Sequence, residues 1–127
     1  MTKQIITCEP DVTVLQAAKI MAKNDVGCLI VVDEGKAVGI VTERDLLKKV
    51  TATGMSPSRA RVSKIMSSPV LTVNPGDSVR RVAKLMRDNN IRRLVVVSGG
   101  KLRGVITVRD ITDAIIGTMA ELSTPAE

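Results

Sequence analysis

Apolar residues in this chain follow two spacings, and each spacing predicts one kind of element. Unbroken apolar runs around Leu29 and Leu94 predict buried strands, whereas apolar residues at helical spacing follow Thr13 and Ser78, which suit helix N-caps. Strands are expected at 5–7, 28–33, 37–42, 70–73, 93–98 and 102–107. Helices are expected from 14 to about 24, from 79 to about 90, from 43 to about 50 and from 108 to about 119.

The order of these elements is β-α-β-β-α, and it occurs twice. Two Gly-containing segments, Glu34-Gly35-Lys36 and Gly99-Gly100-Lys101, predict the hairpin turn of each copy. Residue n aligns with residue n+65 without a gap over positions 1–50, and 17 of these 50 pairs are identical. This match indicates a duplication. We expect a first motif at 1–53, a linker at 54–65, a second motif at 66–121 and a frayed tail at 122–127.

The amino-acid composition excludes several classes of function. The 127 residues include two Cys and no His, Phe, Tyr or Trp. Without His the chain has no Ser-His-Asp triad and no imidazole metal site, and two Cys cannot make a Cys-only zinc site. We therefore expect no catalytic residues, no metal and no enzyme activity. The chain also lacks the aromatic side chains on which many RNA-binding folds stack bases. Without Phe, Tyr or Trp, the hydrophobic core must be aliphatic.

The chain carries no signal for a membrane or for secretion. No apolar run approaches the roughly 18 residues of a membrane span, and the N-terminus lacks the apolar region of a signal peptide. Cys8 and Cys28 do not amount to a disulfide scaffold, and we expect both to be buried, unreactive thiols. A cytoplasmic location is the expectation.

One heptapeptide recurs at the same phase of both copies. Gly39-Ile40-Val41-Thr42-Glu43-Arg44-Asp45 is matched by Gly104-Val105-Ile106-Thr107-Val108-Arg109-Asp110, and Val62-Ser63-Lys64-Ile65-Met66-Ser67 leads into the second copy. With these residues each copy resembles a CBS motif, and the pair resembles a Bateman module. The resemblance implies an α+β fold with two β-α-β-β-α repeats packed by pseudo-twofold symmetry. It also implies binding of AMP, ADP, ATP or S-adenosylmethionine between them, with no required cofactor, and regulation of a partner protein.

The Thr-x-x-Asp element of each copy has two interpretations. Thr42 and Thr107 stand where a strand passes into a helix, where free N–H groups and the hydroxyl suit a phosphate. Asp45 and Asp110, three residues later, can accept hydrogen bonds from ribose hydroxyls. The same spacing is also that of a capping box, in which Thr caps the helix and Asp reaches back. The spacing leaves both roles open.

The resemblance extends the candidate site to other positions in each copy. For motif 1 the candidate ligand-binding residues are Thr7, Cys8, Pro10, Val26, Gly27, Cys28, Thr42, Arg44 and Asp45. For motif 2 they are Thr72, Val73, Pro75, Ile91, Arg92, Arg93, Thr107, Arg109 and Asp110. Because Gly27-Cys28 aligns with Arg92-Arg93, only the second copy offers arginines near the expected phosphate position. We therefore expect unequal sites.

The net charge is also distributed unequally between the two parts of the chain. Residues 1–50 contain seven basic and seven acidic residues, whereas 51–127 contain twelve and six, so the whole net charge of +6 lies in the second part. The linker contributes Arg59, Arg61 and Lys64 to this charge, and Arg80, Lys84 and Arg87 fall on one helix face of the second copy. Nucleic-acid binding through the basic linker and second repeat is therefore an alternative function, beside the simpler interpretation of a solvated face. The family precedent and the apolar last helix predict a homodimer. The apolar residues of that helix are Ile111, Ile115, Ile116 and Met119.

Overall fold

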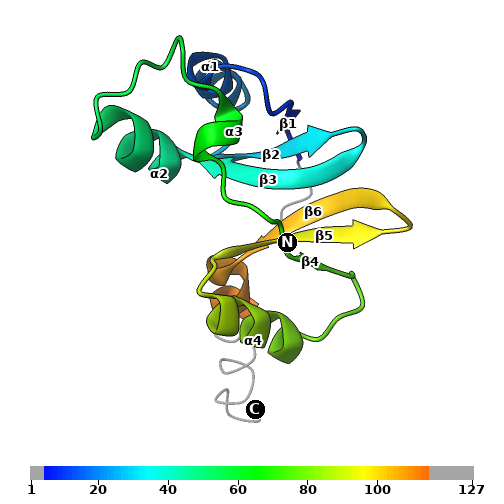
Figure 1. Ribbon diagram of the computed structural model, residues 1–127. Coiled ribbons are helices and arrows are strands. Elements are labelled where there is room, and N and C mark those ends of the chain that lie inside the picture. The colour runs from blue at the N-terminus through cyan, green and yellow to red at the C-terminus, as the bar shows by residue number, and fades with distance from the viewer. Residues whose placement is uncertain (1–4, 115–127) are drawn as a thin grey trace. The chain divides into compact units, whose positions relative to one another are not determined.

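The computed structural model describes residues 5–114 of the chain (Figure 1). The chain forms two compact units, one at Ile5–Val70 and one that begins at Leu71. Each unit is an α+β structure around one three-stranded sheet, which confirms the expected fold class. The expected end of the last helix near 119, the tail at 122–127 and the three apolar residues Ile115, Ile116 and Met119 lie outside the described residues.

The first unit contains the expected β-α-β-β-α elements and one additional short helix, and the helix expected from 43 to about 50 is divided into an α-helical turn and a π-helix. In chain order they are β1 (Thr7–Cys8), α1 (Val14–Asn24), β2 (Cys28–Asp33), β3 (Lys36–Thr42), α2 (Glu43–Asp45), the π-helix η1 (Leu46–Thr51) and α3 (Val62–Ile65). The sheet order is β1-β2-β3, with β1 parallel and β3 antiparallel to β2.

The second unit repeats this plan. Its elements are β4 (Thr72–Val73), α4 (Val79–Asn89), β5 (Arg93–Ser98), β6 (Lys101–Thr107) and a helical stretch at 108–114. The sheet order is β4-β5-β6, and every residue pair between these strands corresponds to a pair of the first sheet shifted by 65 residues, including a β-bulge at the same place. The duplication seen in the sequence is therefore also a duplication of backbone geometry.

Local sequence signals fix the ends of these elements. The Thr13 hydroxyl accepts a hydrogen bond from Gln16 N, and Ser78 caps α4 in the same way, as expected. The C-cap residues of α1 and α4 are Asp25 and Asn90, both with a left-handed φ of 52°. Each hairpin turns on two residues with positive φ, Glu34-Gly35 and Gly99-Gly100, which is the type I′ geometry that matches strand twist.

Each sheet has two faces with different surroundings. Leu29 and Val31 point into a cluster with α1, and Leu94 and Val96 point into the equivalent cluster with α4. In Figure 1 the helices of each unit lie on this side of its sheet. The residues between them alternate to the opposite side, because successive strand side chains point to opposite faces. We call that side of each sheet the far face.

The segment expected as a linker is folded onto the first unit. Ala60, Val62 and Ile65 belong to the buried cluster of this unit, and Val62 is fully buried. Backbone bonds hold the segment in place, from Val14 N to Ala60 O at 2.9 Å and from Val62 N to Val12 O at 2.9 Å. Residues 54–65 thus connect the two motifs and also complete the core of the first one.

A tight contact at Gly39 holds the end of this segment against β3. Ile40 and Ser67 exchange two backbone hydrogen bonds, of 3.1 and 2.9 Å. A Cβ at position 39 would lie 2.5 Å from Met66 Sδ and 3.1 Å from Ser67 O. Met66 can swing away, but the Ser67 carbonyl is part of the backbone and cannot move without straining these bonds.

We therefore expect Gly39→Ala to lower the free energy of unfolding by about 1–3 kcal/mol, the usual cost of overpacking. Gly76→Ala is the matched control, since a Cβ there meets nothing within 4 Å. Urea unfolding followed by far-UV circular dichroism measures both. Equal unfolding midpoints for the two variants would contradict the importance of this contact.

Candidate functional site

Strand register gathers four of the candidate residues of each motif at one place. In the first unit Cys28 pairs with Thr42 and Thr7 pairs with Ile30, so Thr7, Cys28 and Thr42 share the far face. Asp45 is one turn beyond Thr42 and hydrogen-bonded to it. The second unit gathers the equivalent residues, which are Thr72, Arg93, Thr107 and Asp110. The far face beside the strand–helix junction is therefore the candidate site of each motif.

The Thr-x-x-Asp element forms a capping box in both units. Asp45 Oδ2 accepts hydrogen bonds from Thr42 N at 2.9 Å and from Thr42 Oγ1 at 3.1 Å, while Thr42 Oγ1 accepts from Asp45 N at 3.2 Å. Asp110 and Thr107 make the same three bonds within 0.1 Å. The capping interpretation is confirmed. A carboxylate accepts about four hydrogen bonds, so each Asp keeps acceptor positions that Thr does not use.

The two carboxylates differ in their surroundings. Asp45 is 9% exposed, and its Oδ1 lies 3.2 Å from Lys49 Nζ, which also donates to Ile65 O at 2.9 Å. Asp110 is half-buried, and the residue aligned with Lys49 is Ala114. A ligand at the first site would have to compete with a lysine of this chain for the carboxylate. The second site has no lysine at that position.

The residue opposite the threonine differs too. Arg93 is the cross-strand partner of Thr107 and is half-buried, whereas the partner of Thr42 is Cys28. A guanidinium provides up to five donors and a fixed charge, which a thiol does not. The second site is thus better suited to an anionic group than the first, and whether the two sites bind ligands unequally stays a prediction.

The remaining candidates lie away from this far-face group. Cys8 and Val73 point into the two buried clusters, and Val26 and Ile91 pack against the same clusters from the loops. The carbonyl oxygens of Gly27 and Arg92 accept the N–H groups of Glu43 and Val108. Pro75, Arg44 and Arg109 are exposed, whereas Pro10 is half-buried and its carbonyl oxygen accepts a hydrogen bond from Ser63 N at 2.9 Å.

Arg92 and Arg93 were not separable in the sequence, and the structure separates them. Arg93 is the first residue of β5 and faces the far side, while Arg92 lies before the strand, exposed, beside a pocket against α4. The distinction depends on where the strand begins, because a shift of one residue exchanges the two faces.

Burial of the two cysteines differs. Cys8 is 8% exposed and Cys28 is half-buried, so only the first fully meets the expectation of a buried thiol. Desolvation raises the pKa of the Cys8 thiol from 9.0 to about 11. Folding therefore favours the neutral thiol, and the stability that this contributes is present below pH 9 and is lost as the pH rises through about 11.

We expect the alkylation of Cys8 by iodoacetamide at pH 8 to be about a hundredfold slower in the folded protein than in urea, since the reactive thiolate is that much rarer. Mass spectrometry of quenched samples measures the rate, and Cys28 serves as the internal comparison. Equal rates in folded and unfolded protein would contradict the burial of Cys8.

Neither a metal cluster nor a membrane-spanning helix occurs in the part of the chain that the structure describes. Between residues 5 and 114 no group of three or more His, Cys, Asp or Glu side chains is placed to hold a metal ion. Within the same range no helix is long and apolar enough to cross a membrane.

The fold and the paired candidate sites define a tandem module of two repeated α+β units, and comparison with known proteins gives its family. The CBS domain model matches residues 1–52 and 62–117, and the chain belongs to the CBS-domain family as a tandem pair. CBS-domain pairs are generally regulatory ligand-binding modules.

Several relatives and solved structures are similar over most of the chain. An uncharacterized protein of Methanopyrus kandleri is 40% identical over 86% of this chain and 57% of its own length. The CBS domain-containing protein YhcV of Bacillus subtilis is 34% identical over 87% of this chain and 79% of its own. The hexameric CBS-CP12 protein from bloom-forming cyanobacteria superposes with a TM-score of 0.81 at 36% identity, over 100% of this chain and 73% of that chain. The chain thus spans a little over half of the first of these relatives.

Proposed function

We propose that this CBS pair is a non-catalytic regulatory module that binds an adenosine-containing nucleotide and signals its level to a partner protein. The candidate ligands are AMP, ADP, ATP and S-adenosylmethionine. The observation that carries the proposal is the group of Arg93, Thr107 and Asp110 on the far face of the second unit. It combines a fixed cation for phosphate with a carboxylate for ribose hydroxyls, which is the pair of groups that a nucleotide requires.

The second motif is the principal site in this proposal. Its arginine has no counterpart in the first motif, where Cys28 stands opposite the threonine and Lys49 occupies one oxygen of Asp45. Because the chain lacks aromatic residues, the adenine must be held by aliphatic side chains and backbone groups.

Thermal unfolding with added ligand tests the proposal. A ligand that binds only the folded chain stabilises it by about 2.7 kcal/mol at a hundred times its dissociation constant, which raises the melting temperature by several degrees. Far-UV circular dichroism records this with AMP, ATP and S-adenosylmethionine, and cytidine monophosphate is the control for phosphate without adenine. The proposal fails if none of the adenine compounds changes the melting temperature at millimolar concentration.

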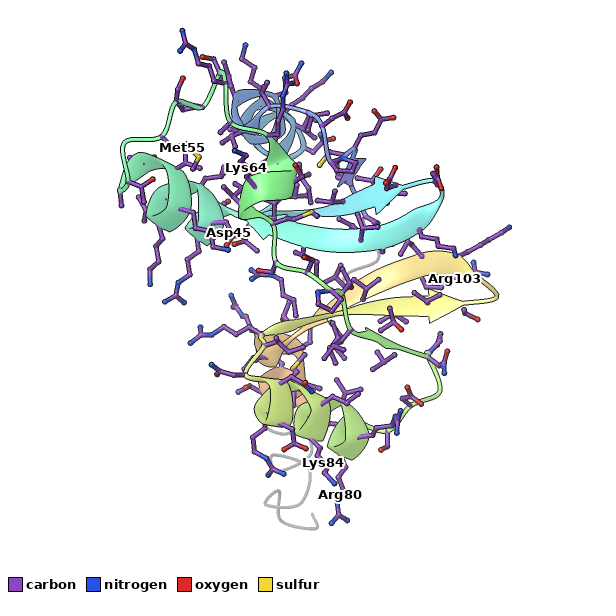
Figure 2. The ribbon with its side chains drawn as sticks, in the orientation of Figure 1. Asp45, Met55, Lys64, Arg80, Lys84 and Arg103 are labelled. Atoms are coloured by element: carbon purple, nitrogen blue, oxygen red, sulfur yellow. The ribbon has the colours of Figure 1, made fainter. Side chains whose placement is uncertain are left out.

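Nucleic-acid binding through α4 is the second candidate. Arg80, Lys84 and Arg87 are exposed, and Figure 2 shows Arg80 and Lys84 projecting from the helix. Acidic neighbours reduce the positive potential of α4. Asp77 Oδ2 lies 3.6 Å from Arg81 Nε, and Asp88 Oδ1 lies 3.5 Å from Arg87 Nε. Binding of this kind would weaken steeply with added salt, whereas the nucleotide site would be affected far less.

A further inference from the structure

Both oxygens of the Asp45 carboxylate are engaged by groups of this chain. Oδ2 accepts the N–H and the hydroxyl of Thr42, at 2.9 and 3.1 Å, and Oδ1 lies 3.2 Å from Lys49 Nζ. The Asp45 side chain is 12% exposed, so few water molecules reach the carboxylate. A ribose whose hydroxyls donate to Oδ1 must therefore take the place of the Lys49 ammonium group.

Lys49 also reaches a second element of the first unit. Its Nζ donates to Ile65 O at 2.9 Å, and Ile65 is the last residue of α3. The last carbonyl groups of a helix have no partner within the helix, and a lysine side chain can satisfy them. Two residues further on, Ser67 pairs with Ile40 of β3. One ammonium group thus joins the candidate site to the segment that leads into the second motif.

The second motif differs at the aligned positions. Ala114 aligns with Lys49 and has no ammonium group. The backbone differs as well, since residues 46–51 form the π-helix η1 whereas 111–114 are α-helical. Turns of π-helix are rare and frequently occur at functional sites. Within residues 5–114 the lysine and the π-helix therefore occur together, beside the Asp45 carboxylate of the first repeat.

We propose that Lys49 is an internal competitor that closes the first site to ribose hydroxyls, and that a bound ligand loosens its hold on Ile65. This inference rests on the proposed function, because it takes the ligand to be a nucleoside or a nucleotide. A ligand shifts an equilibrium only by binding one state better, and the two states here differ in the donor that Asp45 Oδ1 accepts. Once the ribose replaces the ammonium group, Lys49 loses its anionic partner and only the carbonyl of Ile65 holds it. Occupancy of the first site then loosens the end of α3, whereas the second site binds without this step.

The first test removes the competitor and measures the binding of adenosine, which carries the ribose hydroxyls and no phosphate. In isothermal titration calorimetry of the full chain, Lys49→Ala should strengthen the weaker adenosine site about tenfold, the contribution of a hydrogen bond to a charged group. 2′-Deoxyadenosine lacks one of the two hydroxyls and should gain much less. Lys48→Ala is the matched control, because it removes the same charge from the preceding, exposed residue and should change neither affinity.

The reciprocal variant Ala114→Lys transfers the competitor to the second motif. Residues four apart on an α-helix are neighbours, so the new ammonium group can reach Asp110. This variant should weaken the stronger adenosine site about tenfold and leave the weaker one unchanged. Circular dichroism verifies that every variant is folded, and Ala114→Lys keeps the competition testable if Lys49→Ala does not fold.

The second test follows the end of α3 and needs no ligand. Met66 N donates to Val62 O and Ser67 N donates to Ile40 O, both at 2.9 Å, so both amides should be protected from hydrogen exchange. In Lys49→Ala we expect both amides to exchange about fivefold faster, the effect of losing one hydrogen bond of ordinary strength. The amides of α1 serve as the reference for a general loss of stability.

Added adenosine connects the two tests. Saturating adenosine should accelerate the exchange of Met66 and Ser67 in the wild type. It should add nothing in Lys49→Ala, where the lysine is already missing. An acceleration that originated at the second site would persist in this variant, so the comparison assigns the effect to the first site.

Three results would overturn the proposal. The first is an equal gain of adenosine and 2′-deoxyadenosine affinity in Lys49→Ala, and the second is the same behaviour of Lys49→Ala and Lys48→Ala. The third is unchanged exchange of Met66 and Ser67 in Lys49→Ala. A different result, no adenosine binding by any variant, would refute the proposed function and the release step with it. The exchange rates without ligand would then still decide whether Lys49 holds the end of α3.

Discussion

Replacing Asp45 with alanine is expected to lower the free energy of unfolding by about 2–3 kcal/mol, because it leaves two donors of Thr42 without an acceptor and ends the pairing with Lys49. The carboxylate is 9% exposed and lies 2.9 Å from Thr42 N, so little water can replace it. Since the chain has no aromatic residue, unfolding in urea must be followed by far-UV circular dichroism rather than by fluorescence.

Asp45→Asn is the matched control for this prediction. An amide oxygen can still accept the Thr42 N–H, but the charge that faces Lys49 at 3.2 Å is lost, so we expect a smaller loss of about 1 kcal/mol. A loss below about 0.5 kcal/mol for both variants would mean that the capping box contributes little. Nucleotide binding that disappears without a loss of stability would instead assign Asp45 to the ligand.

Replacing Arg93 with alanine is expected to weaken the binding of AMP by about ten- to a hundredfold, the usual contribution of a hydrogen bond to a charged group. Its cross-strand pairing with Thr107 puts the guanidinium beside the junction at which we propose the phosphate binds. Isothermal titration calorimetry measures the change, and adenosine is the essential second ligand. Because adenosine has no phosphate, Arg93→Ala should leave its affinity nearly unchanged.

Two controls separate a phosphate contact from a structural effect. Cys28→Ala alters the aligned residue of the first motif and should leave AMP affinity within about twofold of the wild type. Cys28→Arg places the residue of the second motif in the first, and it should strengthen phosphate binding there if the two sites differ for the reason proposed. Equal losses of AMP and adenosine on Arg93→Ala would contradict a direct contact with the phosphate.

Those parts of the fold that depend on neighbouring residues were predictable from the sequence. Thr13 and Ser78 cap helices because a short hydroxyl side chain reaches the N–H three residues on, which needs no tertiary information. The Glu34-Gly35 turn follows from the preference of hairpins for two residues with positive φ. Because the sequence is duplicated, the same signal occurs at the aligned position of both copies, and each occurrence supports the prediction made from the other.

Features that depend on contacts between residues far apart in the sequence could not be predicted in the same way. Residues 54–65 contain Gly54, Pro57 and three Ser, which favoured a connector, yet Val62 and Ile65 are almost fully buried. Backbone bonds to Val12 and Val14, about fifty residues away, hold them there.

Because residues 54–65 pack onto the first unit, the repeated sequence motif and the compact folded unit have different boundaries. The duplication repeats every 65 residues and each copy starts near a methionine, but the first compact body closes only with residues that follow its own motif. During synthesis the first motif would therefore remain incomplete until about residue 65 had left the ribosome, by which point translation of the second motif is under way. A gene fragment cut at the motif boundary of 53 would encode an exposed core, whereas a cut after Val70 would respect the physical body.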